Sequence, residues 1–205
     1  MKAAVVLFSV PIFGAAMSAS SPSRTRAPEV PVCLDRIAQA STSVTYLAQA
    51  EASKLLARAA IQVEWTHGRS CQSGAAIHVH LTVQTPDNLL PGALAFCQPA
   101  IRDDIRILYD RVQSTVSPAH EPHLLAYVLV HEIVHILEGE ARHSSTGIMK
   151  AEWTPEDYAA MASGKLTFTA EDVELVRNGM IDRQASLNAP AHKEHTEPPQ
   201  SEPAY

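Results

Sequence analysis

The chain has 205 residues, 46% of them apolar, which is enough for one compact domain with its own core. Its formal net charge is −6, so it lacks the basic field that attracts phosphate backbones. We therefore expect no nucleic-acid partner.

The N-terminus has the pattern of a secretory signal peptide. Met1 and Lys2 precede an apolar run over residues 3–17, and small residues follow that run. The run is shorter than the roughly 20 residues that a membrane-spanning helix needs, and no second apolar stretch reaches that length. We expect residues 1–19 to be removed and the product to be secreted or periplasmic, with no stable membrane insertion. An ordinary buried helix is the alternative interpretation of this segment.

Two polar segments bound the predicted domain. Residues 20–31 are rich in Ser, Pro and charged residues, which is typical of a flexible lead-in. Residues 189–205 are rich in Pro and Glu, with too few apolar side chains to order themselves. We therefore place one domain at residues 32–188, followed by a disordered tail.

The chain has three cysteines, Cys33, Cys71 and Cys97, and an exported chain would carry them into an oxidising compartment. The simplest arrangement is one disulfide and one free thiol, with three possible pairings. We favour Cys71–Cys97, because both residues lie at loop-like breaks that flank a predicted strand. No C-x-x-C pair is present, so we do not expect a zinc site made of thiolates.

The first half of the predicted domain combines a helix with strands. Residues 43–60 place apolar side chains at helical intervals and should form an amphipathic helix. Residues 61–65 and 76–83 alternate apolar and polar side chains, which predicts two strands of a sheet covered on one face. Residues 104–112 are a third strand candidate, although so short a run is also compatible with a helix.

The second half is predicted to be helical. Residues 124–137 are apolar nearly all round, as in a helix buried in a core, with Pro122 near its start and Gly139 just past its end. Residues 154–162 and 169–187 each begin with Thr in the N-cap position and should form two more helices. We therefore predict an α+β domain with a short mixed sheet, a buried central helix and a C-terminal helix.

The buried helix carries an HExxH pattern that suits a metal ion. Residues four apart lie on one helical face, so His131 and His135 can present imidazole nitrogens to one Zn²⁺. Glu132 would lie beside the ion, where it could act as general base towards a water molecule that the metal acidifies. Burying these groups unpaired would cost several kcal/mol. The alternative interpretation is two hydrogen-bonded core histidines with a paired glutamate.

A catalytic zinc site needs a third protein ligand, which must come from the chain after this helix. Gly139 can adopt a left-handed conformation that turns the chain back, and His143 follows it by four residues. His143 is therefore the preferred third ligand, although a surface loop histidine would have the same pattern. Glu152 is the main reserve. Other acidic residues nearby are Glu138, Glu140 and Glu156.

Residues 131–150, HEIVHILEGEARHSSTGIMK, resemble the zinc-binding region of the metzincin metallopeptidases. In that family a helical HExxH is followed by a Gly, a third His and a turn that contains Met. The resemblance implies a small zincin-like fold with a Met-turn, zinc held by His131, His135 and His143, base catalysis by Glu132, and Met149 packed beneath the metal. It extends to small exported bacterial proteins that share the HS-x-x-GIM step.

The sequence departs from the family in the loop after the helix. The family usually places Gly three residues and the third His six residues after the second ligand, whereas here they follow His135 by four and eight. The loop is therefore two residues longer. Four other histidines are expected to face solvent or to cap helices and not to bind the metal: His78 and His80 on the polar face of a predicted strand, and His120 and His123 before the buried helix.

These patterns favour an exported zinc peptidase that acts on a peptide or protein substrate as a monomer. Two alternatives stay open at the level of sequence. One is a non-catalytic metal-binding protein on a zincin scaffold. The other is a gluzincin-like peptidase that uses Glu152 as its third ligand.

Overall fold

In the computed structural model of the chain, residues 29–37, 39–68, 71, 74–86, 89, 91–97 and 103–188 are described. The predicted signal peptide, residues 1–19, and the predicted tail, residues 189–205, lie outside the described residues. The described residues form an α+β fold. Its elements, in chain order, are β1 (Glu29–Asp35), α1 (Thr42–Arg58), β2 (Gln62–Thr66), β3 (Ile77–Thr82), β4 (Ala95–Cys97), β5 (Asp104–Leu108), α2 (Tyr109–Thr115), α3 (Glu121–Glu138), α4 (Pro155–Ala162) and α5 (Ala170–Asn188).

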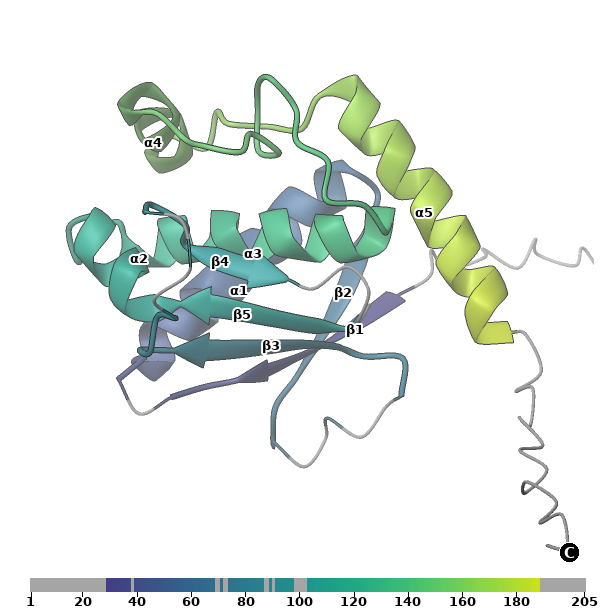
Figure 1. The fold of residues 1–205 in the computed structure, drawn as a ribbon, viewed down its shortest axis with the longest axis horizontal. Coiled ribbons are helices and arrows are strands. Elements are labelled where there is room, and N and C mark those ends of the chain that lie inside the picture. Colours follow the sequence, from purple (N-terminus) through teal and green to yellow (C-terminus); the bar gives the residue numbers. More distant parts are fainter. Residues whose placement is uncertain are drawn as a thin grey trace, which may run out of the picture.

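The strands form one mixed sheet in the order β2-β1-β3-β5-β4 (Figure 1). The pairs β1–β2, β1–β3 and β3–β5 are parallel, and β4 pairs antiparallel with β5. Among the described strands, β4 therefore lies at the edge of the sheet, and no strand pairs with its outer side.

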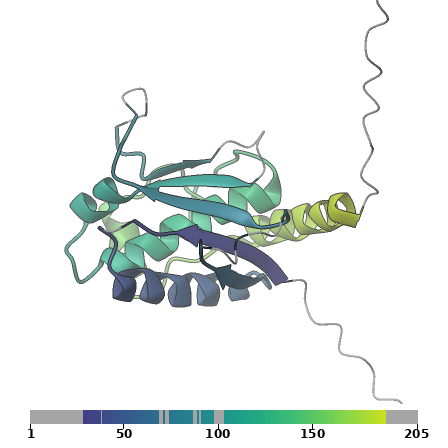
Figure 2. The same ribbon diagram turned by 90° about the horizontal axis from the view of Figure 1, so that it is seen from below.

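Helices α1 and α3 pack beside each other on one face of the sheet, and the core lies between them and the strands (Figures 1 and 2). Strand β3 shows how the sequence selects that face, because Ile77, Val79 and Leu81 are buried while the residues between them are only partly covered. The buried positions of α1 recur every three or four residues, which lays one stripe of the helix on the core.

Helix α3 is the central element, and its residues 124–137 are all buried. It begins three residues before the predicted start, with Pro122 in its first turn, and Gly139 ends it with a φ of 74°. That left-handed conformation is cheap for glycine alone, and it turns the chain back along the helix.

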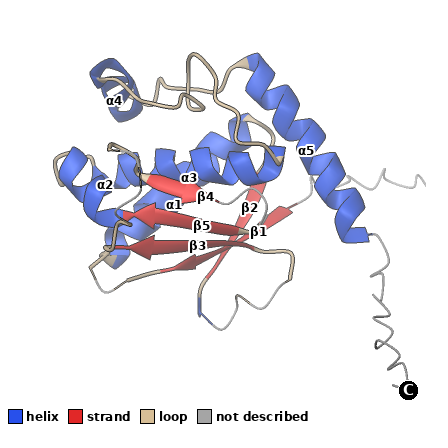
Figure 3. Cartoon of the chain, viewed as in Figure 1, coloured by secondary structure: helices blue, strands red, loops and turns tan. Residues whose placement is uncertain are grey.

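The chain after α3 forms loops, the short helix α4 and the long helix α5 (Figure 3). In the view of Figure 1, α4 and the loops around it lie above α3, the sheet lies below α3, and α5 runs downward past the right end of α3. Thr154 and Asp157 form a capping box at the start of α4. Helix α5 passes so close to the C-terminal end of α3 that a Cβ on Gly179 would lie 2.0 Å from the Leu137 carbonyl oxygen.

The structure confirms most of the predicted elements and corrects three points. The predicted third strand, residues 104–112, is divided, because β5 ends at Leu108 and α2 begins at the next residue. Strand β1 was not expected, and it includes residues 29–31 of the predicted flexible lead-in. Strand β4 was also not expected, since three residues are too few to show an alternating pattern.

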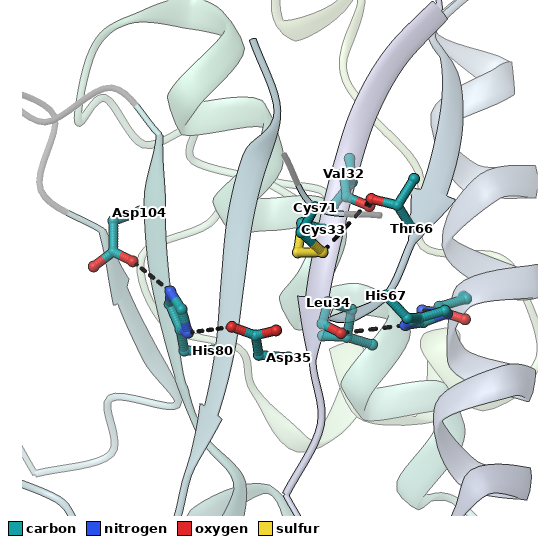
Figure 4. The surroundings of a disulfide bond; sticks show 10 residues. Val32, Cys33, Leu34, Asp35, Thr66, His67, Cys71, His80 and Asp104 are labelled. Atoms are coloured by element: carbon teal, nitrogen blue, oxygen red, sulfur yellow. Dashed lines mark hydrogen bonds and ion pairs between the residues drawn. A yellow bond between two sulfur atoms is a disulfide. The ribbon is translucent and has the colours of Figure 1, made fainter. Parts of the chain in front are cut away.

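The favoured disulfide pairing, Cys71–Cys97, is wrong. Cys33 of β1 bonds to Cys71 on the face of the sheet away from α1 and α3, and Cys97 is a free thiol in β4 (Figure 4). The expected count of one bridge and one free thiol is confirmed. The pairing could not be predicted because β1 itself was missed, so Cys33 was assigned to no element near Cys71. None of the helices in the described ranges is long and apolar enough to cross a membrane.

Candidate metal centre

His131 and His135 face each other one turn apart on α3. Their Nε2 atoms are 3.0 Å apart, and both residues are buried, with exposed fractions of 8% and 5%. Each ring is held from behind by a backbone carbonyl. The Nδ1 of His131 donates to Ile148 at 2.9 Å, and the Nδ1 of His135 donates to Glu140 at 3.1 Å.

These carbonyl contacts decide where the histidine protons lie. A backbone carbonyl only accepts hydrogen bonds, so each Nδ1 must carry a proton, and a neutral imidazole has only one. Both Nε2 atoms then present lone pairs to each other. A further proton between them is disfavoured, because burial lowers the pKa of His131 to about 3 and that of His135 to about 4. A shared cation would satisfy both lone pairs at once.

His143 completes a group of three imidazoles. Ligand nitrogens of His131, His135 and His143 all lie within 4.8 Å of one another. The ring centroid of His143 is 5.4 Å from that of His131 and 4.9 Å from that of His135. Partial burial, followed by the nearby Arg142 guanidinium, lowers the pKa of His143, which favours the neutral form that binds metals. The sequence-predicted triad is thus brought together.

The donor set and its surroundings fit Zn²⁺. Three neutral imidazoles are an established zinc ligand set, and ligand histidines commonly donate their other N–H to a carbonyl, as His131 and His135 do. Glu152, the reserve ligand, is exposed and is not part of the triad. Met149 is fully buried in the turn that follows His143, and its carbonyl accepts from the Ser144 N–H at 2.7 Å.

Glu132 lies next to the first ligand and is also buried, with 7% of its surface exposed. Burial raises the pKa of its carboxyl group to about 7. Interaction with the Cys97 thiol of β4 acts in the opposite direction and lowers this pKa. Burial first, and Glu132 second, raise the pKa of Cys97 to about 12, so this cysteine stays a thiol near neutral pH.

A cleft of about 420 Å³ opens beside this group, a volume within the range of ligand pockets. One wall consists of the residues that lead into β4, from Pro91 to Ala95, and another of residues 150–153. His131, Glu132 and His143 line the cleft between these walls. The arrangement therefore combines a potential metal site, a buried carboxylate and room for a ligand.

Sequence reasoning identified the three histidines and Glu132 but missed the groups that hold them. The carbonyls of Ile148 and Glu140 carry no side-chain signal, so no pattern could have identified them. Cys97 was treated only as a disulfide candidate. The other histidines do not join the triad: His120 is exposed, His78 and His80 are half-buried on the face of β3 opposite its buried residues, and His123 pairs with Glu51 at 2.6 Å.

Comparison with known proteins adds no assignment: no family model matches the chain, and no curated protein matches it significantly.

Proposed function

We propose that this chain is an exported zinc-dependent peptidase with a metzincin-type site. His131, His135 and His143 would hold Zn²⁺, and Glu132 would be the general base. One observation carries the proposal: two buried imidazoles fix their Nδ1 protons on carbonyls, face each other through Nε2 at 3.0 Å, and are joined by a third imidazole. The order of elements, from the mixed sheet through buried α3 and the turn at Met149 to α5, supports a metzincin-like domain.

The chemistry follows from what these residues can do. A bound zinc ion would polarise the scissile carbonyl and acidify water in the cleft. Glu132 takes a proton from the attacking water, whose oxygen forms a bond to the carbonyl carbon. As the C–N bond breaks, Glu132 delivers that proton to the leaving amine nitrogen. Burial raises the pKa of this carboxyl group in the metal-free protein, and a bound zinc ion would lower it, so the carboxylate that accepts the proton would be present near neutral pH.

The shape of the cleft supports an extended peptide as the substrate. The wall from Pro91 to Ala95 runs into β4, the edge strand of the sheet. An edge strand offers unpaired N–H and C=O groups that can pair with an extended chain. A peptide bound in this way would pass the three imidazoles and Glu132. The proposal includes a monomeric enzyme that needs no partner subunit.

Export is part of the proposal, and the disulfide supports it. The Cys33–Cys71 bond joins residues 38 positions apart. Bonds of this kind persist in oxidising compartments and are rare in the cytosol. Secretion itself depends on the predicted signal peptide at residues 1–19.

The test is to compare the wild-type protein with Glu132→Ala for zinc content and for cleavage of an unfolded protein substrate. We expect about one zinc per chain in both proteins, because Glu132 is not a ligand. We expect cleavage by Glu132→Ala to fall by roughly 100- to 10,000-fold, the contribution typical of a general base. Zinc is measured by elemental analysis and cleavage by mass spectrometry.

Glu152→Ala is the matched control, because Glu152 lines the same cleft but stands outside the triad. It should keep both zinc and cleavage; loss of zinc in this variant would favour the gluzincin-like alternative. Undiminished cleavage by Glu132→Ala would refute the mechanism. Bound zinc without turnover of any peptide by the wild-type protein would favour a non-catalytic metal-binding protein.

A further inference from the structure

His143 differs from the other two imidazoles of the triad because it is exposed and stands on a loop. Within the part of the chain that the structure describes, no hydrogen bond from its own ring fixes the imidazole. Its two neighbours along the chain, however, are held firmly. Arg142 Nη2 donates to Asp172 Oδ1 at 2.8 Å, and the Ser144 hydroxyl donates to the same carboxylate oxygen.

Asp172 is fully buried, with an exposed fraction of 0%, in the first turn of α5. Its second carboxylate oxygen, Oδ2, accepts from the Thr169 N–H at 2.9 Å, and its own N–H donates to the Thr169 hydroxyl at 3.1 Å. These two bonds form a capping box. One carboxylate therefore joins the start of α5 to the residues on both sides of His143.

The loop is closed further by contacts within itself. Arg142 Nη1 donates to the Ser144 hydroxyl at 3.0 Å, which bridges over His143. The Ser144 N–H donates to the Met149 carbonyl at 2.7 Å. A loop two residues longer than the metzincin pattern has more conformations to lose when it is ordered. The carboxylate of Asp172, which bonds to Arg142 and Ser144, restrains this loop.

We propose that Asp172 is a positioning residue for the third metal ligand. It holds Arg142 and Ser144, and through them it sets the backbone of His143 so that the imidazole meets those of α3. The inference rests on the proposed zinc site and assigns to α5 a part in building it. The acceptor is a carboxylate and one of its donors is the Arg142 guanidinium, and such charge-assisted bonds are short and directional.

The test measures zinc affinity, by competition with a chromogenic chelator, in a cycle of four proteins: wild type, Asp172→Asn, His143→Ala and the double variant. We expect Asp172→Asn to weaken zinc binding by about 10- to 100-fold, as is typical for groups that orient a metal ligand. In the His143→Ala background the same substitution should change affinity by less than about 3-fold, because the residue through which Asp172 acts is absent.

The double variant separates positioning from general damage to the fold. If Asp172 only stabilises the domain, its loss weakens zinc binding equally in both backgrounds, and the inference is wrong. Unchanged affinity in Asp172→Asn would also overturn it. The Co²⁺-substituted proteins give a second readout, because loss of one imidazole from a tetrahedral site should weaken the visible d–d bands in Asp172→Asn.

Two further variants serve as a control and as a substitute for Asp172→Asn. Glu171→Gln removes a carboxylate one residue away at an exposed position, and it should bind zinc as the wild type does. If Asp172→Asn does not fold, Ser144→Ala removes one donor and leaves the capping box intact. That variant should weaken zinc binding by roughly 3- to 10-fold, and only when His143 is present. Absence of zinc from the wild type would refute the proposed function itself. A zinc affinity that these substitutions leave unchanged would refute only the role of Asp172.

Discussion

Two pairs of histidines lie close together in this protein, and their surroundings differ. On α3, the rings of His131 and His135 have centroids 4.6 Å apart, and each uses Nδ1 on a backbone carbonyl. On β3, the rings of His78 and His80 are stacked with centroids 6.4 Å apart. Both nitrogens of His80 are engaged by carboxylates, Nδ1 with Asp35 at 3.1 Å and Nε2 with Asp104 at 2.9 Å (Figure 4).

The two pairs differ in whether the second nitrogen of the ring keeps a lone pair for a metal or is already held by a carboxylate. A carbonyl on Nδ1 fixes one tautomer and leaves Nε2 with a free lone pair, which is how ligand histidines are prepared. Carboxylates on both nitrogens occupy both of the ring atoms through which a histidine can bind a metal. The proximity of two histidines therefore does not by itself identify a metal site.

The largest expected effect is a loss of zinc binding when a histidine of the α3 pair is removed, with no such loss when a histidine of the β3 pair is removed. His135→Ala should weaken zinc binding by roughly 1,000-fold or more, beyond the range of about 10- to 100-fold for groups that only orient a ligand. His80→Ala should leave zinc affinity unchanged and alter the free energy of unfolding by at most about 1 kcal/mol, as for exposed ion pairs. Chelator competition and urea unfolding measure the two quantities. Equal zinc loss in both variants would contradict the distinction drawn between the pairs.

A second prediction concerns the carboxylates beside the two pairs. Glu132 has an exposed fraction of 7%, and burial raises the pKa of its carboxyl to about 7 from the ordinary value of 4.5. Between pH 4.5 and pH 7, the folded protein keeps a proton that the unfolded chain releases. Glu132 by itself therefore contributes stability that is lost as the pH rises through this window, whereas the lowered pKa values of His131 and His135 act in the opposite direction.

Glutamine cannot ionise, so Glu132→Gln escapes this loss. Its stability relative to the wild type should rise by about 2–3 kcal/mol between pH 5 and pH 8, measured by urea unfolding with chelator present. Asp104→Asn is the control, because the side chain of Asp104 is 33% exposed in its ion pair with His80. If the difference in free energy of unfolding between Glu132→Gln and the wild type does not change with pH, burial does not raise the pKa of Glu132.

The predictability of the fold followed the strength of local patterns. Helices with caps or long periodic stretches, such as α1, α4 and α5, were predicted to within a few residues, because their signals repeat over several turns. Strand β4 has three residues, and β1 holds Val30, Val32 and Leu34 around a proline and a buried cysteine. Both strands are fixed by pairing with neighbours that are distant in the chain, which one sequence does not reveal.

The predictability of the site divides in the same way. The spacing of four between His131 and His135 is a local property of a helix, so their convergence could be predicted. His143 was placed correctly from the turn at Gly139. The link from Arg142 to Asp172 spans 30 positions and depends on how α5 packs, so no local pattern contains it. Cys97 was missed for a similar reason, since it reaches Glu132 only through the pairing of β4 with β5.

The smallest of these effects tests the carbonyl that prepares His131. Gly147 has a φ of 80°, and a Cβ there would lie 2.4 Å from the Thr167 carbonyl oxygen. That same oxygen accepts from the Ile148 N–H at 3.1 Å. The carbonyl of Ile148 in turn accepts the hydrogen bond from His131 Nδ1. Gly147→Ala should therefore displace the carbonyl of Ile148, lower the free energy of unfolding by about 2 kcal/mol and weaken zinc binding by about 10-fold.

Gly74→Ala is the matched control, because a Cβ at Gly74 would meet no atom within 4 Å. It should change the free energy of unfolding by less than about 0.5 kcal/mol and leave zinc affinity unaltered. Thermal unfolding without metal and chelator competition give the two values for each variant. If Gly147→Ala destabilises the protein but binds zinc as tightly as the wild type, the Ile148 carbonyl does not prepare His131. The contrast between the two histidine pairs would then rest on burial alone.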